Sequence, residues 1–146
     1  TGNDDHYLLD LLTPHVVMRD GAPVTLRIRG GLLGQWSVWT RAAVGVLEMA
    51  HQVALGETVP SRLLSLDAQL TDANGALFDV HNAFHGCIAG CHEVLRRQGL
   101  LDNLVLIDPD EGLSPGQAAE IDRVCAAYPH ITDDAFVRSN LERWLT

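Results

Sequence analysis

The side chains best suited to bind a metal lie close together in the sequence, as His81, His85, Cys87, Cys91 and His92. Imidazole and thiolate groups are zinc ligands. On one continuous helix, however, the histidines would form a stripe about 40° wide, with the cysteines roughly 140° away from it. One ion could not bind both sets, so the sequence predicts no metal site and no metal cofactor. His81 and His85 alone leave a metal-binding helix as a weaker alternative.

The same segment carries a face of small residues, made of Ala83, Gly86, Cys87, Gly90 and Cys91. Small side chains let another element approach closely. If that element belongs to a different molecule, the chain is a non-enzymatic helical interaction module. This is the main alternative to an enzymatic function.

Nucleophilic catalysis has little support in the residues themselves. Cys87, Cys91 and Cys125 have apolar neighbours and no base placed beside them by a local motif, which predicts buried, unreactive thiols. Their odd number favours reduced thiols in a cytoplasm over a disulfide framework. All ten basic residues are arginine, so the chain by itself has no lysine amine with which to form a Schiff base.

Other groups with chemical potential have simpler interpretations. Gly30, Gly31 and Gly34 match neither glycine fingerprint of nucleotide-binding loops. Arg27 and Arg29 either bind an anion or keep an edge strand soluble, and the second is favoured because charge commonly protects edge strands. The acidic residues between 108 and 111 lack the closing glutamate of a calcium loop, so we expect a solvated turn there.

Length and charge exclude several classes of protein. The chain has 146 residues, 47% of them hydrophobic, and a net charge of −9, as expected of one soluble globular domain. The absence of lysine and the acidic balance argue against a nucleic-acid surface. The longest apolar run, 42–47, is far below the ~20 residues that span a bilayer, and no signal peptide opens the chain. We therefore expect a cytoplasmic protein, and the start at Thr1 without a methionine predicts a fragment.

The first third of the chain must place a loop, a hairpin and a long helix. The pattern predicts a short helix at 7–12, ended by Pro14. It then predicts a hairpin of 15–19 and 23–29 around Asp20-Gly21-Ala22, and an apolar strand over 30–36. A helix over about 38–55 follows, closed by Gly56. Trp36 and Trp39 are expected to fill the core.

From residue 60 onward the pattern is helical. One helix begins at Pro60-Ser61 and is expected to break or bend at 72–75, where Asp, Asn and Gly cluster. Another runs from about Leu77 or Asn82 to Gly99. Ser114-Pro115-Gly116-Gln117 is typical of a capping box, which starts a helix ending near Tyr128. Thr132 is expected to cap the last helix.

The order of these features resembles a known family. Thr1-Gly2-Asn3-Asp4, a short helix, the pair Gly30-Gly31, and Trp36-Ser37-Val38 before a long helix are similar to the C-terminal portion of the dihydrodipicolinate synthase / N-acetylneuraminate lyase family. The tail, from Asn82 through Leu113-Ser114-Pro115 to Tyr128, resembles the helical domain of that family.

The resemblance implies an α/β parent protein, a TIM barrel followed by a helical domain. Residues 1–58 would be the last strand–helix units of the barrel, with an inserted hairpin at 13–29, and residues 59–146 the helical C-terminal domain. The chain as given would be mostly α-helical, with one hairpin and a remnant of a barrel strand.

It also implies a function. The family consists of class I aldolase-type lyases, in which pyruvate or another 2-oxo acid forms a Schiff base with a strand lysine while a tyrosine relays protons. Neither residue would lie in this chain, so it would hold no catalytic residue and be inactive alone, and no cofactor is implied. Gly2, Asn3, Asp4 and Trp36 would line the substrate pocket. The parent would be a homo-oligomer without nucleic-acid or membrane partners.

Overall fold

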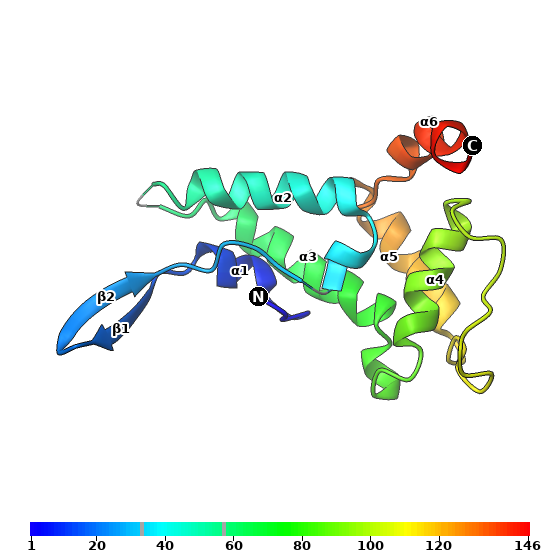
Figure 1. Cartoon of the computed structure of the whole chain (residues 1–146), viewed down its shortest axis with the longest axis horizontal. Helices are drawn as coiled ribbons and strands as arrows, with labels where there is room; N and C mark the ends of the chain where they lie inside the picture. The colour runs from blue at the N-terminus through cyan, green and yellow to red at the C-terminus, as the bar shows by residue number, and fades with distance from the viewer. Residues whose placement is uncertain (33, 57) are drawn as a thin grey trace.

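The computed structural model describes residues 1–146 except Leu33 and Glu57, and it is built mainly from helices (Figure 1). The α-helices are α1 (Tyr7–Leu12), α2 (Thr40–Val53), α3 (Arg62–Leu77), α4 (Cys87–Arg97), α5 (Gln117–Ala127) and α6 (Asp134–Leu145). Three short 3-10 helices are η1 (Gly34–Ser37), η2 (Val80–Asn82) and η3 (Pro129–Ile131), and the strands are β1 (His15–Arg19) and β2 (Ala22–Leu26). A mostly helical chain with one hairpin confirms the predicted fold class of the chain itself. The parent barrel stays a prediction.

The core is centred on α3, which packs against α1, α4 and α5. Helix α1 buries four of its six residues because its apolar side chains recur on the side that faces α2 and α3. One cluster of buried side chains joins these helices, and it includes Leu8, Leu11, Trp39, Leu70 and Ile121. The cluster contains residues from both sides of position 58. The predicted division of the chain at that position stays a prediction. No helix in the described part of the chain is long and apolar enough to cross a bilayer.

The first residue lies beside the glycine pair. Thr1 N donates a hydrogen bond to Gly30 O over 2.5 Å, and Leu32 N donates one to Thr1 O over 3.0 Å. One residue thus bonds to those before and after Gly31, which is the hydrogen-bond pattern of a single residue pair in a parallel ladder, although neither segment forms a strand. A Cβ atom on Gly31 would lie 2.0 Å from Trp36 Nε1, so the indole ring can occupy its position only against a glycine.

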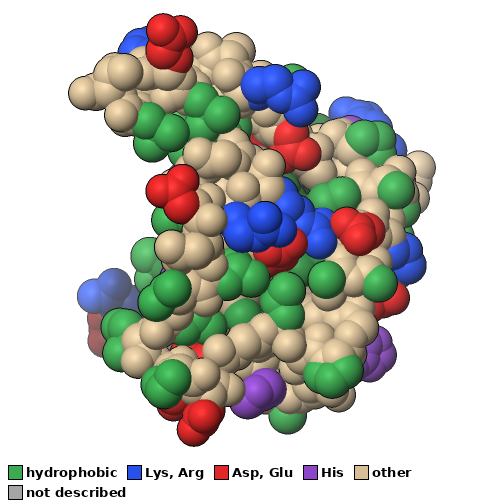
Figure 2. Space-filling view, turned by 90° about the vertical axis from the view of Figure 1, so that its right-hand side faces the viewer, with side chains coloured by type: hydrophobic (Ala, Val, Ile, Leu, Met, Phe, Trp, Pro, Cys, Tyr) green, Lys and Arg blue, Asp and Glu red, His purple; other side chains and the backbone are tan. Residues whose placement is uncertain are grey.

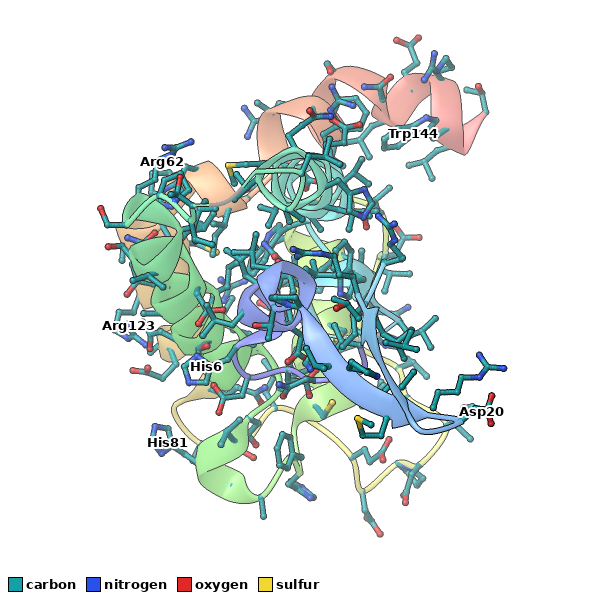
Figure 3. The ribbon with its side chains drawn as sticks, turned by 90° about the vertical axis from the view of Figure 1, so that its left-hand side faces the viewer. His6, Asp20, Arg62, His81, Arg123 and Trp144 are labelled. Carbon is teal, nitrogen blue, oxygen red and sulfur yellow. The ribbon has the colours of Figure 1, made fainter. Side chains whose placement is uncertain are left out.

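The hairpin projects from the helical body (Figure 1). Its register pairs His15 with Leu26 and Arg19 with Ala22. Asp20 and Gly21 both have positive φ, as a two-residue turn of type I′ requires. Every residue of β1 is exposed, and Asp20 lies at the tip, away from the helices (Figure 3). The predicted hairpin is confirmed, although β2 begins at Ala22 and ends at Leu26.

The strand predicted over 30–36 is wrong, because none of the described residues in this range belongs to a strand. Gly34–Ser37 forms η1 instead, and Leu33 lies outside the described residues. The buried amide of Gln35 accounts for this, because it accepts a hydrogen bond from Tyr7 Oη and donates one to Ile131 O over 3.3 Å. These contacts turn the backbone away from an extended path.

The predicted break in the third helix is also wrong, because α3 continues through 72–75 to Leu77. Asp72 and Asn74 favour turns locally, but both are engaged elsewhere. Asp72 accepts hydrogen bonds from Arg123 and from Tyr128 Oη, and Asn74 Nδ2 donates to Asp4 O over 2.8 Å. With their side chains held by other elements, they no longer compete for the helix backbone.

Two other boundaries differ from the prediction. The helix expected from Leu77 or Asn82 begins only at Cys87, after η2 and a turn in which Ala83 and Phe84 have positive φ. Thr132 does not cap α6, because its hydroxyl donates to Pro129 O over 3.0 Å. Asp133 is the residue before the helix.

Candidate functional site

The loop of Gly2, Asn3 and Asp4 follows directly on the residue that pairs with Gly31. Asn3 N donates to Thr1 Oγ1 over 3.1 Å, and Asp5 N donates to Asn3 Oδ1 over 3.0 Å, so the turn is closed by its own side chains. Asn74 Nδ2 holds the carbonyl of Asp4 from α3. The loop is therefore fixed at both of its ends.

A cavity of about 460 Å³ opens between this loop and α3. Its walls come from the loop, from α3 and from the turn around η2: Gly2, Asn3, Asp4, Asp5, Thr71, Asn74, Gly75, Val80 and Phe84. Gly2, Asn3 and Asp4, which are adjacent in the sequence, thus all line one cavity.

Two of the residues that line this cavity, Asp4 and Asn74, hold buried acceptors without a donor in the described part of the chain. Burial raises the pKa of the Asp4 carboxyl above its usual range. Asp4 Oδ1 and Asn74 Oδ1 are buried and have no hydrogen-bond partner among the described residues. A buried acceptor without a donor is costly, by about 1–3 kcal/mol. The cavity is therefore suited to a ligand that donates hydrogen bonds.

Trp36, the fourth residue predicted to line the pocket, does not line this cavity. Its ring lies 5.3 Å from that of Tyr7, at a tilt of 57°, and it covers Gly31. Its Nε1 is buried without a partner among the described residues. Trp36 thus packs against Gly31 and Tyr7 and does not face the cavity beside Gly2, Asn3 and Asp4.

The histidine and cysteine segment is not one helix, contrary to the geometry assumed from sequence. His81 lies in η2, His85 in the following turn and His92 in α4. Within the described ranges, no group of three or more His, Cys, Asp or Glu side chains is arranged to hold a metal ion.

The thiols are unsuited to nucleophilic chemistry. All three cysteines are free and half-buried, so the prediction that they are fully buried is wrong. Burial raises the pKa of Cys87 and of Cys125, and raises that of Cys91 to about 12. A thiol with such a pKa is protonated at neutral pH and is a poor nucleophile.

The small-residue face is occupied by the chain itself. A Cβ on Gly90 would lie 2.0 Å from Leu77 O, and a Cβ on Gly86 would lie 2.0 Å from Gln117 Oε1. The close approach predicted from the small residues is confirmed, but the approaching elements are α3 and α5. This face is therefore not free to dock a partner.

A buried polar network at this contact was not found by sequence reasoning. Asp79 accepts hydrogen bonds from Ser114 Oγ (2.5 Å), Asn82 Nδ2 (2.7 Å) and Gly86 N (2.9 Å). Burial opposes ionisation, but these donors hold the pKa of Asp79 below its usual range.

Gln117 completes the network. Its amide donates to Leu77 O and Gly86 O, and its Oε1 accepts from Ser114 N, which forms half of the predicted capping box. The Ser114 hydroxyl, expected at the helix start, is instead bound by Asp79. Each group of the network has its partners, so we assign it a structural role.

Comparisons of the chain with protein-family models, with curated proteins and with solved structures returned no match. The family resemblance therefore rests on the short sequence motifs alone.

Proposed function

We propose that the chain is part of a Schiff-base-forming aldolase-type lyase that acts on pyruvate or another 2-oxo acid. In this proposal residues 1–58 are the last strand–helix units of a barrel of the dihydrodipicolinate synthase / N-acetylneuraminate lyase type. The remainder of the barrel, with the lysine and the tyrosine of the reaction, belongs to a longer parent chain.

The observation that carries the proposal is the parallel pairing of Thr1 with Gly31. In this proposal the pairing is what is left of two parallel barrel strands, which must be joined by a crossover, and α1 lies in the connection between Thr1 and Gly31. A strand, a helix and a parallel neighbouring strand form the repeating unit of a barrel. The pairing falls at the two positions where the resemblance puts neighbouring barrel strands.

The position of Gly2, Asn3 and Asp4 agrees with this assignment. They follow the carboxyl end of the first paired segment, and barrel enzymes build their active sites from the loops at that end of the strands. The hairpin lies in the connection from α1 to the second segment, which puts it at the opposite end of the barrel. It would therefore not cover the pocket.

The chain's own contribution would be to bind and orient. With no lysine among its residues it offers no amine to the substrate carbonyl. Asp4 and Asn74 present buried acceptors, which fit the hydroxyl donors of a hydroxylated 2-oxo acid and not pyruvate, whose oxygens only accept hydrogen bonds. The amine that forms the Schiff base would come from the parent.

The test is reductive trapping in the parent. The full open reading frame that contains these residues is incubated with pyruvate, or with a series of other 2-oxo acids, and reduced with borohydride. We expect a covalent adduct on a lysine outside residues 1–146, located by peptide mass mapping. The chain of residues 1–146, treated in the same way, is the control and should acquire no adduct.

Two results would overturn the proposal. One is a parent that traps none of the 2-oxo acids, and the other is an adduct on the control chain. Within a parent that acts on a hydroxylated 2-oxo acid, Asp4→Asn is expected to lower kcat/KM for that substrate by about tenfold or more, because a hydrogen bond to a charged group contributes about 1.5–3 kcal/mol. Asp20→Asn, at the hairpin tip, is the matched substitution and should leave kcat/KM unchanged.

A further inference from the structure

Two segments at opposite ends of the molecule expose apolar side chains. In β1, Val16 and Met18 are 67% and 69% exposed. In the segment 104–107, Val105 is 77% exposed and Ile107 is fully exposed. The hairpin and this segment lie at the two ends of the long axis in Figure 1, so neither can cover the other within one chain.

Both segments also have unpaired backbone edges. β1 is bonded only to β2, in a sheet of two strands, and its outer edge has no partner among the described residues. Such an edge is a template for a further strand, and a two-stranded hairpin alone is marginally stable. β2 is less suited to this role because Pro23 lacks an N–H.

The segment 104–107 has the character of a strand without a sheet. Its sequence, Leu-Val-Leu-Ile, favours extended backbone, and its residues alternate between half-buried and exposed. The only hydrogen bond that the described residues give to its backbone is from Val105 N to Asn103 Oδ1, over 3.0 Å.

The charges of the two segments are complementary. The hairpin segment 13–29 holds three of the ten arginines and one of the nineteen acidic residues, so its net charge is +2 whereas that of the rest of the chain is −11. β1 begins at His15 and ends at Arg19, and the segment 104–107 lies between Asp102 and Asp108. Either direction of pairing therefore brings an acidic residue toward Arg19.

Hydrophobic, acidic and arginine side chains all reach the surface at the end of the molecule shown in Figure 2, so the acidic partner for Arg19 comes from Asp102 and Asp108 beside the segment and not from the face as a whole. This is the end that carries α4 and the loop that follows it (Figure 1). A basic, apolar strand edge on a second molecule finds there the two features it needs.

We propose that β1 of one copy of this chain adds as a strand to the segment 104–107 of a second copy. The added strand extends the hairpin to three strands and covers apolar side chains of both segments. If each copy offers its hairpin to the other, two such contacts close a symmetric dimer. The inference does not depend on the proposed lyase function.

Charge reversal provides the test, with sedimentation velocity of the chain at a concentration on the order of 100 μM, suited to a weak interface. We expect reversible self-association that weakens as salt is added. Arg19→Glu places like charges together and should raise the dissociation constant about tenfold. Combining Arg19→Glu with Asp102→Arg or Asp108→Arg in one chain should restore association, and the pair that does so gives the strand direction.

Arg62→Glu is the matched control, because Arg62 is exposed on α3 and points into solvent away from the hairpin (Figure 3). Equal weakening by Arg19→Glu and Arg62→Glu would mean that only net charge matters, and would overturn the proposal. So would a wild-type chain that stays monomeric at low salt, or a failure of both combined variants to restore association.

Hydrogen exchange supplies a second readout that nonspecific aggregation would not produce. Backbone amides of 104–107 should exchange more slowly as the protein concentration rises in the wild-type chain, and should show no such dependence in Arg19→Glu. Exchange that is independent of concentration in both proteins would contradict strand addition. All the substituted side chains are exposed, and far-UV circular dichroism will verify that each variant is folded.

Discussion

Replacing Gly90 by alanine should destabilise the chain, because α4 crosses α3 and α5 at this residue without room for a side chain. The added Cβ would lie 2.0 Å from Leu77 O, 2.7 Å from Gln117 Nε2 and 3.1 Å from Leu77 C. Two of these atoms are backbone of α3, so they cannot move aside as the end of a flexible side chain could. The helices must separate, or Gln117 must leave its buried position.

The size of the effect follows from three contributions. Forcing extra volume into a packed contact costs about 1–3 kcal/mol. Displacing the Gln117 amide, which donates to Leu77 O and Gly86 O, leaves a buried acceptor unpaired at a cost of about 1–3 kcal/mol. Alanine is better than glycine in a helix by about 1 kcal/mol, which offsets part of this loss. We expect a net loss of about 3 kcal/mol, or about 6–12 °C in Tm for a chain of this length.

The assay is urea unfolding at neutral pH, followed by far-UV circular dichroism, with the midpoint and the slope both recorded. Gly45→Ala is the matched control, since Gly45 lies within α2 and a Cβ there would meet nothing within 4 Å. The control should be more stable than the wild-type chain by about 0.5–1 kcal/mol. The two glycine-to-alanine changes are thus expected to have opposite signs. A Gly90→Ala chain as stable as the wild type, or one that shifts in the same direction as Gly45→Ala, would refute the packing described here.

Three further predictions use other contacts. Gly31→Ala should lower the free energy of unfolding by about 1–3 kcal/mol and change the tryptophan emission, because its Cβ would lie 2.0 Å from the Trp36 ring. Gly30→Ala is the control and should change neither, because the space around its Cβ is open. Asp79→Asn should lower the free energy of unfolding most near neutral pH and less below about pH 4, because a carboxyl with a lowered pKa stabilises the fold above its unfolded pKa and loses that contribution on protonation. Urea unfolding of both chains at pH 7 and pH 3 measures this. A difference in stability between the two chains that grows in acid would contradict it. The pKa of His6 should lie above 6.5, chiefly because of its hydrogen bond to Asp67, and NMR titration should find this pKa lowered in Asp67→Asn. The pair stabilises the fold below about pH 6.5, and this contribution is lost as the pH rises through the pKa of His6 in the folded state.

Local sequence signals predicted those elements whose causes are local. Helix α1 ends before Pro14 because proline restricts the residue that precedes it. The hairpin follows from Asp20-Gly21, since a type I′ turn needs positive φ at both central residues. Both features depend on residues only a few positions apart, which the order of amino acids displays directly.

The substrate pocket stays a prediction, and the structure shows only where its predicted residues lie. The resemblance singled out Gly2, Asn3 and Asp4, and these do share a cavity. Trp36 was grouped with them, but its ring packs on Gly31 and Tyr7. The cavity also includes side chains of α3, about 70 residues further along the chain, for which the sequence carries no signal.

The sequence by itself determined the hairpin turn, the small-residue face and the absence of any lysine nucleophile. Only the tertiary structure decided what those features contact. Asn74 would favour a turn on its own, yet it stays helical because its amide bonds to the Asp4 carbonyl. Asp79 reaches Ser114 across 35 residues, and Gln117 fills the space that Gly86 and Gly90 leave. Local propensities amount to a few tenths of a kcal/mol per residue, whereas a buried polar group left unpaired costs about 1–3 kcal/mol, so contacts between distant segments override the local preference wherever the two conflict.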